Sequence, residues 1–296
     1  MFTIFTAPKA FNGHIAMIQE NAIASWRKLN SNVEIILFGN ETGVSEMADK
    51  YRAIHISDID KNKYGTPLIS DLFNQAKRHA SHNTLCFINS DIILMSDFIS
   101  ALNVVNQDYD NYLMIGHCWN LDIDWLINFA DEDVENKLKQ QIFNSGSLRD
   151  AYSIDYFVFP KSHYSIIPDF AIGRGWFDHW LIWKSRNLGA VIVDATKSVK
   201  VIHQNHDYSH VAGGKIYAHR GKEAQENLDL AGGPKHLCTI YNATHKLING
   251  KLKRDVVGSY LPRKTKEYFN SLYINALSIS RPFRHAVGLR YYDSKK

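Results

Sequence analysis

The sequence from residue 84 to residue 95 reads Thr84-Leu85-Cys86-Phe87-Ile88-Asn89-Ser90-Asp91-Ile92-Ile93-Leu94-Met95. Its first apolar residues show no helical spacing, and such a run predicts a buried strand. In an open α/β sheet, ligands bind outside the carboxyl ends of buried strands. Asp91 therefore stands where a carboxylate can hold a cation against a phosphate. Asn, Ser and Asp also favour turns for local reasons, so a plain strand-end turn is the alternative.

Three strand-helix units precede this run. Strand-like apolar runs cover residues 2–5, 33–38 and 53–56, and helical spacing covers residues 14–29, 44–51 and a segment after Pro67. This alternation predicts parallel βαβ units in a doubly wound sheet. Right-handed crossovers should bring the loops after the strands to one edge. The residues expected to meet there are Thr6, Ala7, Pro8, Lys9, Asn40, Asp58, Asn89, Ser90 and Asp91.

The second half of the chain is less regular. Residues 131–149 are highly charged and predict a surface helix, and residues 152–160 predict a strand with Asp155 among large apolar side chains. A carboxylate in such surroundings is costly unless it is paired or used. A glycine loop, Gly173-Arg174-Gly175, leads into an amphipathic helix through Trp176-Phe177-Asp178, and a histidine-rich segment follows at residues 201–210.

Composition limits the class of protein. The three cysteines form no CxxC pair, which indicates a reducing compartment and argues against a structural zinc site. The first residues lack a basic signal-peptide region, and no apolar run approaches the ~18 residues of a spanning helix, so we expect a cytoplasmic protein. The Gly-x-Gly-x-x-Gly and P-loop patterns are absent, which disfavours NAD-binding and P-loop NTPase functions.

Charge is distributed unevenly along the chain. Residues 251–296 hold eleven Lys and Arg against three Asp and Glu, whereas the rest holds 23 against 27. This argues for an anionic surface or partner at the tail and against nucleic-acid binding by the whole protein. Helix-like spacing of aromatic and basic residues after Pro262 suits peripheral contact with the inner membrane face or a lipid-linked acceptor. A tail packed on the domain or in an oligomer contact explains the pattern equally well.

The order of these parts resembles the GT-A fold of nucleotide-sugar glycosyltransferases, most closely the bacterial family-2 type. The resemblance covers residues 2–210 and lies in Phe5-Thr6-Ala7-Pro8-Lys9, Gly65-Thr66-Pro67, Phe87-Ile88-Asn89-Ser90-Asp91, residues 173–180 and residues 203–210. It implies a Rossmann-like doubly wound mixed sheet, which we expect over residues 1–247. The composition of residues 248–296 separately predicts a basic helical extension. The family's Asp-x-Asp has Asn89 in its first position here, while Asp91 matches the last Asp, the direct metal ligand in many relatives.

The resemblance implies a metal-dependent transferase that uses Mn²⁺ or Mg²⁺. The cation stabilises charge on the departing nucleotide diphosphate. Asp91 offers an oxygen ligand, and His203 or His206 can complete the shell, most readily for Mn²⁺. Asp178 matches the family's catalytic base, which deprotonates the acceptor hydroxyl in an inverting reaction. The acceptor, a glycan or a lipid-linked molecule, is expected to contact Asp155, Arg174, Trp176 and Trp180.

Each of these residues also has a structural interpretation. The histidines suit a polar loop, Asp178 suits a helix N-terminus, and Lys9 suits solvent. The tryptophans could pack in the core, and Asp155 could belong to a buried ion pair. The side chain of Arg174 could simply pack over the glycine loop. Two other functions remain open. One is a sugar-phosphate nucleotidyltransferase, although residues 6–11 lack that class's glycine-rich basic loop. The other is a non-catalytic glycan- or partner-binding protein on a decayed transferase fold.

Overall fold

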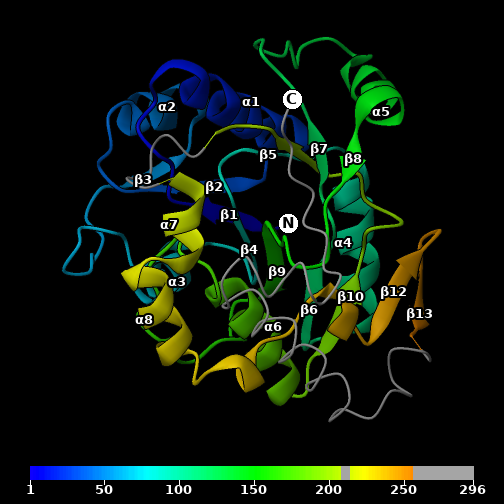
Figure 1. The fold of residues 1–296 in the computed structure, drawn as a ribbon. Helices are drawn as coiled ribbons and strands as arrows, with labels where there is room; N and C mark the ends of the chain where they lie inside the picture. The colour runs from blue at the N-terminus through cyan, green and yellow to red at the C-terminus, as the bar shows by residue number, and fades with distance from the viewer. Residues whose placement is uncertain (208–213, 256–296) are drawn as a thin grey trace, which may run out of the picture.

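Alternating strands and helices build a mixed nine-stranded sheet in the order β13-β12-β10-β6-β9-β4-β1-β2-β3 (Figure 1). The computed structural model describes residues 1–207 and 214–255. The strands of this sheet are β1 (Thr3–Thr6), β2 (Glu34–Phe38), β3 (Ile54–Ile56), β4 (Thr84–Ile88), β6 (Tyr112–Ile115), β9 (Tyr156–Pro160), β10 (Val191–Asp194), β12 (His245–Ile248) and β13 (Lys251–Arg254). A second, four-stranded sheet has the order β5 (Ile92–Ile93), β11 (Ile202–Gln204), β7 (Trp119–Leu121) and β8 (Ser147–Leu148).

Helices cover both faces of the large sheet, because strand side chains alternate between two buried layers. In β1, Ile4 belongs to the cluster that also holds α1 side chains, whereas Phe5 belongs to the cluster under α3 and α6. The helices are α1 (Gly13–Leu29), α2 (Val44–Tyr51), α3 (Ile69–His79), α4 (Asp97–Asp108), α5 (Val134–Ser145), α6 (Phe177–Asn187), α7 (Gly214–Arg220) and α8 (Lys222–Leu230). Short 3-10 turns follow at Pro234–His236 and Ile240–Asn242.

Strands β1, β2, β3 and β4 are parallel, as the sequence predicts. Their carboxyl ends therefore open on one edge of the sheet. Strand β9 is antiparallel to both β4 and β6. An antiparallel strand begins at the edge where its parallel neighbours end, so the residue just before β9, Asp155, lies at the same edge as the residues after β4.

The four-stranded sheet begins at this edge of the large sheet. Strand β5 follows directly after Asp91 and pairs antiparallel with β11, with His203 opposite Ile92. Helix α1 supports β5 from behind: the Trp26 indole Nε1 donates to the Ile92 carbonyl (2.8 Å), and the Ser25 hydroxyl accepts from the Leu94 amide (3.1 Å). The Ile92 carbonyl and the Leu94 amide, which follows the strand, are thus hydrogen-bonded to side chains of α1.

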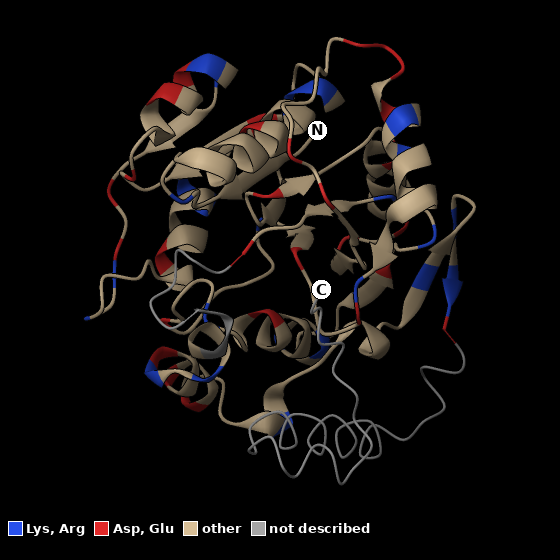
Figure 2. Ribbon diagram, turned by 45° about the horizontal axis from the view of Figure 1, so that its top comes forward, with Lys and Arg blue, Asp and Glu red and all other residues tan. Residues whose placement is uncertain are grey.

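The described end of the chain belongs to the large sheet. Strand β12 pairs parallel with β10, and β13 pairs antiparallel with β12, so residues 248–254 continue the sheet instead of starting a helical tail. The expected boundary after residue 247 thus falls inside β12. Lysine and arginine residues occur along this hairpin (blue in Figure 2), and Lys246 is paired with Asp255 at 3.1 Å. The helical tail predicted beyond residue 255 lies outside the described residues. Within the described ranges, no helix is long and apolar enough to cross a membrane.

Candidate functional site

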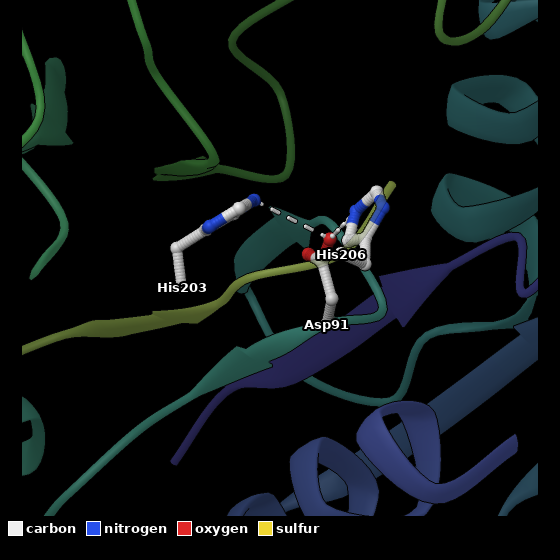
Figure 3. A group of neighbouring side chains, drawn as sticks. All are labelled: Asp91, His203 and His206. Carbon is white, nitrogen blue, oxygen red and sulfur yellow. Dashed lines mark hydrogen bonds and ion pairs between the residues drawn. The ribbon is translucent and has the colours of Figure 1, made fainter. Parts of the chain in front are cut away.

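Asp91, His203 and His206 form a compact group where β5 and β11 meet. His206 Nε2 lies 2.8 Å from Asp91 Oδ2, and His203 Nε2 lies 3.6 Å from the same oxygen. One ligand atom from each residue lies within 4.8 Å of the others. Figure 3 shows the two imidazoles approaching the carboxylate from different sides. The sequence analysis named these three residues as metal ligands, and the fold brings them together. His210, at the end of the same segment, lies outside the described residues.

Two polar atoms of this group are buried without a hydrogen bond, Oδ1 of Asp91 and Nδ1 of His203. Buried polar atoms are nearly always paired, so unpaired ones need an explanation such as an absent ion or water. A carboxylate and two imidazoles are a donor set that suits Mn²⁺ and related transition metals. The residues therefore fit a divalent cation.

Electrostatics give Asp91 and His203 the protonation states that a cation needs. Burial by itself would raise the pKa of Asp91, but His203, His206 and the Lys9 ammonium outweigh burial and lower it. Burial lowers the pKa of His203 to about 4, although Asp91 partly opposes this. At neutral pH, His203 is therefore a neutral imidazole with a lone pair, while Asp91 stays ionised.

Lys9 supplies positive charge beside this group. Burial lowers the pKa of Lys9, and the nearby Asp91 and Asp207 carboxylates oppose that shift. The Lys9 amide donates to Gln19 Oε1 (2.7 Å), and Gln19 Nε2 donates back to the Lys9 carbonyl (2.9 Å). The Ser90 hydroxyl donates to the same Gln19 Oε1 (2.9 Å). Gln19 thus joins the loop after β1 to the loop after β4.

Gln204 makes a second connection, from β11 to α1. Its Nε2 donates to the carbonyls of Ile18 (2.7 Å) and Asp91 (3.0 Å), and its Oε1 accepts from Asn21 Nδ2 (3.0 Å). Gln204 is completely buried. The two histidines, one residue before and two after Gln204, are therefore held at a fixed position relative to Asp91.

Asn89 and Asp155 are neighbours across β4 and β9. The Asn89 amide donates to the Asp155 carbonyl (2.9 Å), and Asn89 Nδ2 donates to Asp155 Oδ1 (3.0 Å). The other oxygen, Oδ2, lies 3.3 Å from Arg149 Nε in an ion pair. Asp155 is thus the buried, paired carboxylate that one interpretation of the sequence expected, and both of its oxygens face protein groups.

Asp178 lies in the first turn of α6, after a strained loop. Gly173, Gly175 and Trp176 all have positive φ, 68°, 55° and 75°, and this conformation is costly for a tryptophan. Among the residues that the structure describes, the one hydrogen bond that Asp178 Oδ1 accepts comes from the neighbouring His179 amide (3.0 Å). His179 Nδ1 donates to the Cys238 carbonyl (2.8 Å), and its Nε2 lies 3.9 Å from Asp178 Oδ2.

The start of α6 is anchored beside the Asp91 strand. Phe177 packs edge-on against Phe87 of β4, with ring centroids 6.2 Å apart. Asn227 of α8 fixes the preceding loop by donating from Nδ2 to the carbonyls of Ala171 (3.0 Å), Arg174 (3.1 Å) and Gly175 (3.0 Å). Asp178 is therefore presented from a rigid loop.

Other predicted site residues have different surroundings. Trp180 is buried in the core against Phe170 and Trp183, so it is not a surface for an acceptor. Arg174 pairs with the buried Glu223 of α8 at 2.7 Å and thus holds α8 on its loop. Trp176 is half-buried beside His179.

The other residues that the sequence places at the carboxyl edge of the sheet do follow the parallel strands there. Thr6 is buried at the end of β1, Ala7 and Pro8 follow it, and Asn40 and Asp58 are exposed after β2 and β3. Asp58 helps line an open groove of about 620 Å³ along β3 and α3. Within the described residues, no hydrogen bond or ion pair joins Asn40 or Asp58 to Asp91.

The sequence analysis missed Gln19, Gln204 and Arg149. Gln19 carried a signal: it lies three, four and seven residues before Ala22, Ile23 and Trp26, on the apolar stripe of α1. A glutamine in that stripe is buried and needs partners.

Comparisons with known proteins support the fold. No protein-family model and no curated protein matches the chain. The structure of S. aureus TarS 1–349 in complex with UDP-GlcNAc matches with a TM-score of 0.54 and 11% identity, over 98% of this chain and 76% of that one. M. tuberculosis glucosyl-3-phosphoglycerate synthase, with Mg²⁺ and UDP, matches with a TM-score of 0.48 and 14% identity, over 79% of this chain and 80% of that one. The predicted GT-A class, a doubly wound mixed sheet, is confirmed.

The connection through Gln204 predicts a stability effect. Replacing Gln204 by Leu removes three buried side-chain hydrogen bonds, those to the Ile18 and Asp91 carbonyls and the one from Asn21, and each contributes about 0.5–1.5 kcal/mol. We expect the free energy of unfolding in urea to fall by about 2–4 kcal/mol. The control Gln225→Leu removes an exposed glutamine of α8 and should change it by less than about 0.5 kcal/mol. Equal effects of the two substitutions would contradict the role of Gln204.

Proposed function

We propose that the protein is a metal-dependent glycosyltransferase that moves a sugar from a nucleotide-diphosphate donor to a glycan or lipid-linked acceptor, with inversion at the anomeric carbon. The observation that carries this proposal is the buried Asp91–His203–His206 group at the carboxyl edge of a GT-A sheet. The similarity to TarS, solved with UDP-GlcNAc, supports a nucleotide sugar as donor.

Asp91, His203 and His206 are the proposed ligands of a divalent cation, with Mn²⁺ favoured over Mg²⁺ by the two imidazoles. When bound, such an ion supplies positive charge against the diphosphate of the donor. Lys9 lies close enough to Asp91 to interact with it electrostatically, so its ammonium is available to the same diphosphate. Gln19 fixes the Lys9 loop and Ser90 relative to each other, so the donor meets a preorganised surface.

Asp178 is the proposed general base. Its carboxylate accepts one backbone hydrogen bond and retains acceptor capacity for an acceptor hydroxyl. The base takes the proton of that hydroxyl as the oxygen forms its bond to the anomeric carbon and the bond from that carbon to the diphosphate oxygen breaks. Trp176, beside the base, is the aromatic side chain proposed to contact the acceptor.

The tail and the location remain proposals. A basic segment that follows the β13 hairpin suits an anionic or lipid-linked acceptor in polysaccharide synthesis, at the cytoplasmic face of a membrane. The oligomeric state is left open.

Two other functions would give different results. A sugar-phosphate nucleotidyltransferase would release pyrophosphate from a nucleoside triphosphate and a sugar phosphate. A non-catalytic binding protein would bind glycan but would hydrolyse or transfer no nucleotide sugar. No observation supports either function as strongly as the metal-ligand group of Asp91, His203 and His206 supports a glycosyltransferase.

The metal site predicts ligand-dependent stability. UDP with Mn²⁺ should raise the melting temperature of the wild-type protein, because a ligand at a hundredfold excess over its Kd stabilises the folded state by about 2.7 kcal/mol. Asp91→Ala and His206→Asn should lose most of this rise in differential scanning fluorimetry. The control His82→Asn, a surface histidine, should keep it. A full rise in Asp91→Ala, or a rise with UDP that needs no metal, would count against the site.

The base assignment predicts a selective loss of chemistry. Asp178→Asn should lower the transfer rate by about 10²–10⁴-fold, because the proton acceptor is lost, while donor affinity stays within about threefold. Asp97→Asn is the control, since Asp97 also lies in the first turn of a helix. Rates come from coupled release of the nucleoside diphosphate, and NMR of the anomeric proton reports inversion. Transfer that survives Asp178→Asn, or a retained anomeric configuration, would remove Asp178 from this role.

A further inference from the structure

Asn89 occupies the position at which the resembled enzymes carry a carboxylate, and its side chain is held by Asp155. The last register pair of β4 and β9 is Ile88 with Tyr156, so Asn89 and Asp155 are the next pair across the two strands. The backbone bond from the Asn89 amide to the Asp155 carbonyl (2.9 Å) fixes their separation. The side-chain bond from Asn89 Nδ2 to Asp155 Oδ1 (3.0 Å) then follows from the backbone geometry.

The chemistry of the pair determines which way the amide faces. A carboxylate has only acceptor atoms, so the Asn89 atom that faces Asp155 must be the NH₂ group. Arg149 lies beside the other oxygen of Asp155 and keeps the carboxylate paired with a positive charge. The carbonyl oxygen, Oδ1, is thereby turned away from Asp155. Within the described residues no group donates to Oδ1, and Asn89 is only half-buried.

On the basis of the proposed function, we propose that Asp155 is a positioning residue that fixes the Asn89 carbonyl oxygen as an acceptor for the donor–cation complex. Asn89 then supplies an oxygen ligand two residues before Asp91. The negative charge that orients it is that of Asp155, the residue just before β9. Asn89 is accordingly a compensated substitution and not a sign of a decayed site. Asp155 acts through Asn89 and does not contact the acceptor.

A purely structural role would be to join β4 to β9. Five register pairs from Thr84 to Ile88 already do this, so one further side-chain bond is not needed for strand pairing. The two roles differ in what a swap of the residues does. Asn and Asp exchanged across the strands restore one amide facing one carboxylate. In contrast, Asn89→Asp sets two carboxylates against each other, and Asp155→Asn replaces an acceptor-only group by an amide that can face Asn89 with either its oxygen or its NH₂ group.

The test compares Asn89→Asp, Asp155→Asn and the swap Asn89→Asp/Asp155→Asn by calorimetric titration of UDP in the presence of Mn²⁺. Asn89→Asp sets two carboxylates at hydrogen-bond distance, and Asp155→Asn frees the amide to rotate. Each single change should weaken UDP binding by about tenfold or more, the equivalent of one lost charge-assisted hydrogen bond. The swap should return affinity to within about threefold of wild type. Asp169→Asn, which removes an exposed carboxylate bonded to Ser70, is the control and should bind as wild type does.

Additive losses in the swap, or single variants that bind as tightly as wild type, would overturn the inference. If Asn89→Asp does not fold, Asn89→Ala serves instead, because it removes the carbonyl oxygen without adding charge. Asn89→Ala should weaken UDP binding as much as Asp155→Asn does. The double variant Asn89→Ala/Asp155→Asn should bind no more weakly than Asn89→Ala, and a further loss of affinity would contradict the inference. If the wild-type protein binds no UDP in the presence of Mn²⁺, both the proposed function and this inference fail. If the wild type binds UDP but the swap does not restore affinity, only this inference fails.

Discussion

The site depends on one buried set of hydrogen bonds, in which amides of α1 and β11 satisfy the backbone around Asp91. Gln204 donates to the Asp91 carbonyl and accepts from Asn21, and Gln19 binds both the Lys9 loop and Ser90. Buried polar groups of this kind are stabilising only when every member has a partner. The strand that carries the histidines and the loop that carries the carboxylate therefore have one low-energy arrangement relative to each other.

That arrangement explains the electrostatics of the site. Asp91 is buried, yet its pKa is lowered and it stays ionised at physiological pH, with the Lys9 ammonium as a positive charge nearby, while burial keeps His203 neutral. The Asp91 carboxylate and the neutral His203 imidazole each keep one buried atom without a hydrogen bond, and they present ligand atoms without needing to rearrange. Asp178 approaches from the other covering layer through the contact of Phe177 with Phe87. The two halves of the proposed chemistry thus share β4 as their common support.

The sequence predicted the strand-helix units and the edge where their loops meet, because periodicity and strand order determine these features. The resemblance to GT-A enzymes, in turn, suggested His203 or His206 as partners of Asp91. It did not predict the antiparallel direction of β9, since alternation of side chains is the same in either direction. Trp180 was expected at an acceptor site because aromatic faces bind sugars, and Arg174 because an arginine in the glycine loop can contact an anionic group. Local sequence does not show that Trp180 is buried in the core or that Arg174 pairs with Glu223. Gln19 and Gln204 required knowledge of which helix faces which strand.

The central claim is that Asp91, His203 and His206 hold a divalent cation at the donor site. Anomalous diffraction at the manganese edge, from crystals containing Mn²⁺ and UDP, tests it most directly. We expect one strong peak within bonding distance of the Asp91 carboxylate and both imidazoles, with the UDP phosphates on its open side. A peak elsewhere, or UDP bound at this edge with no peak among these three residues, would contradict it.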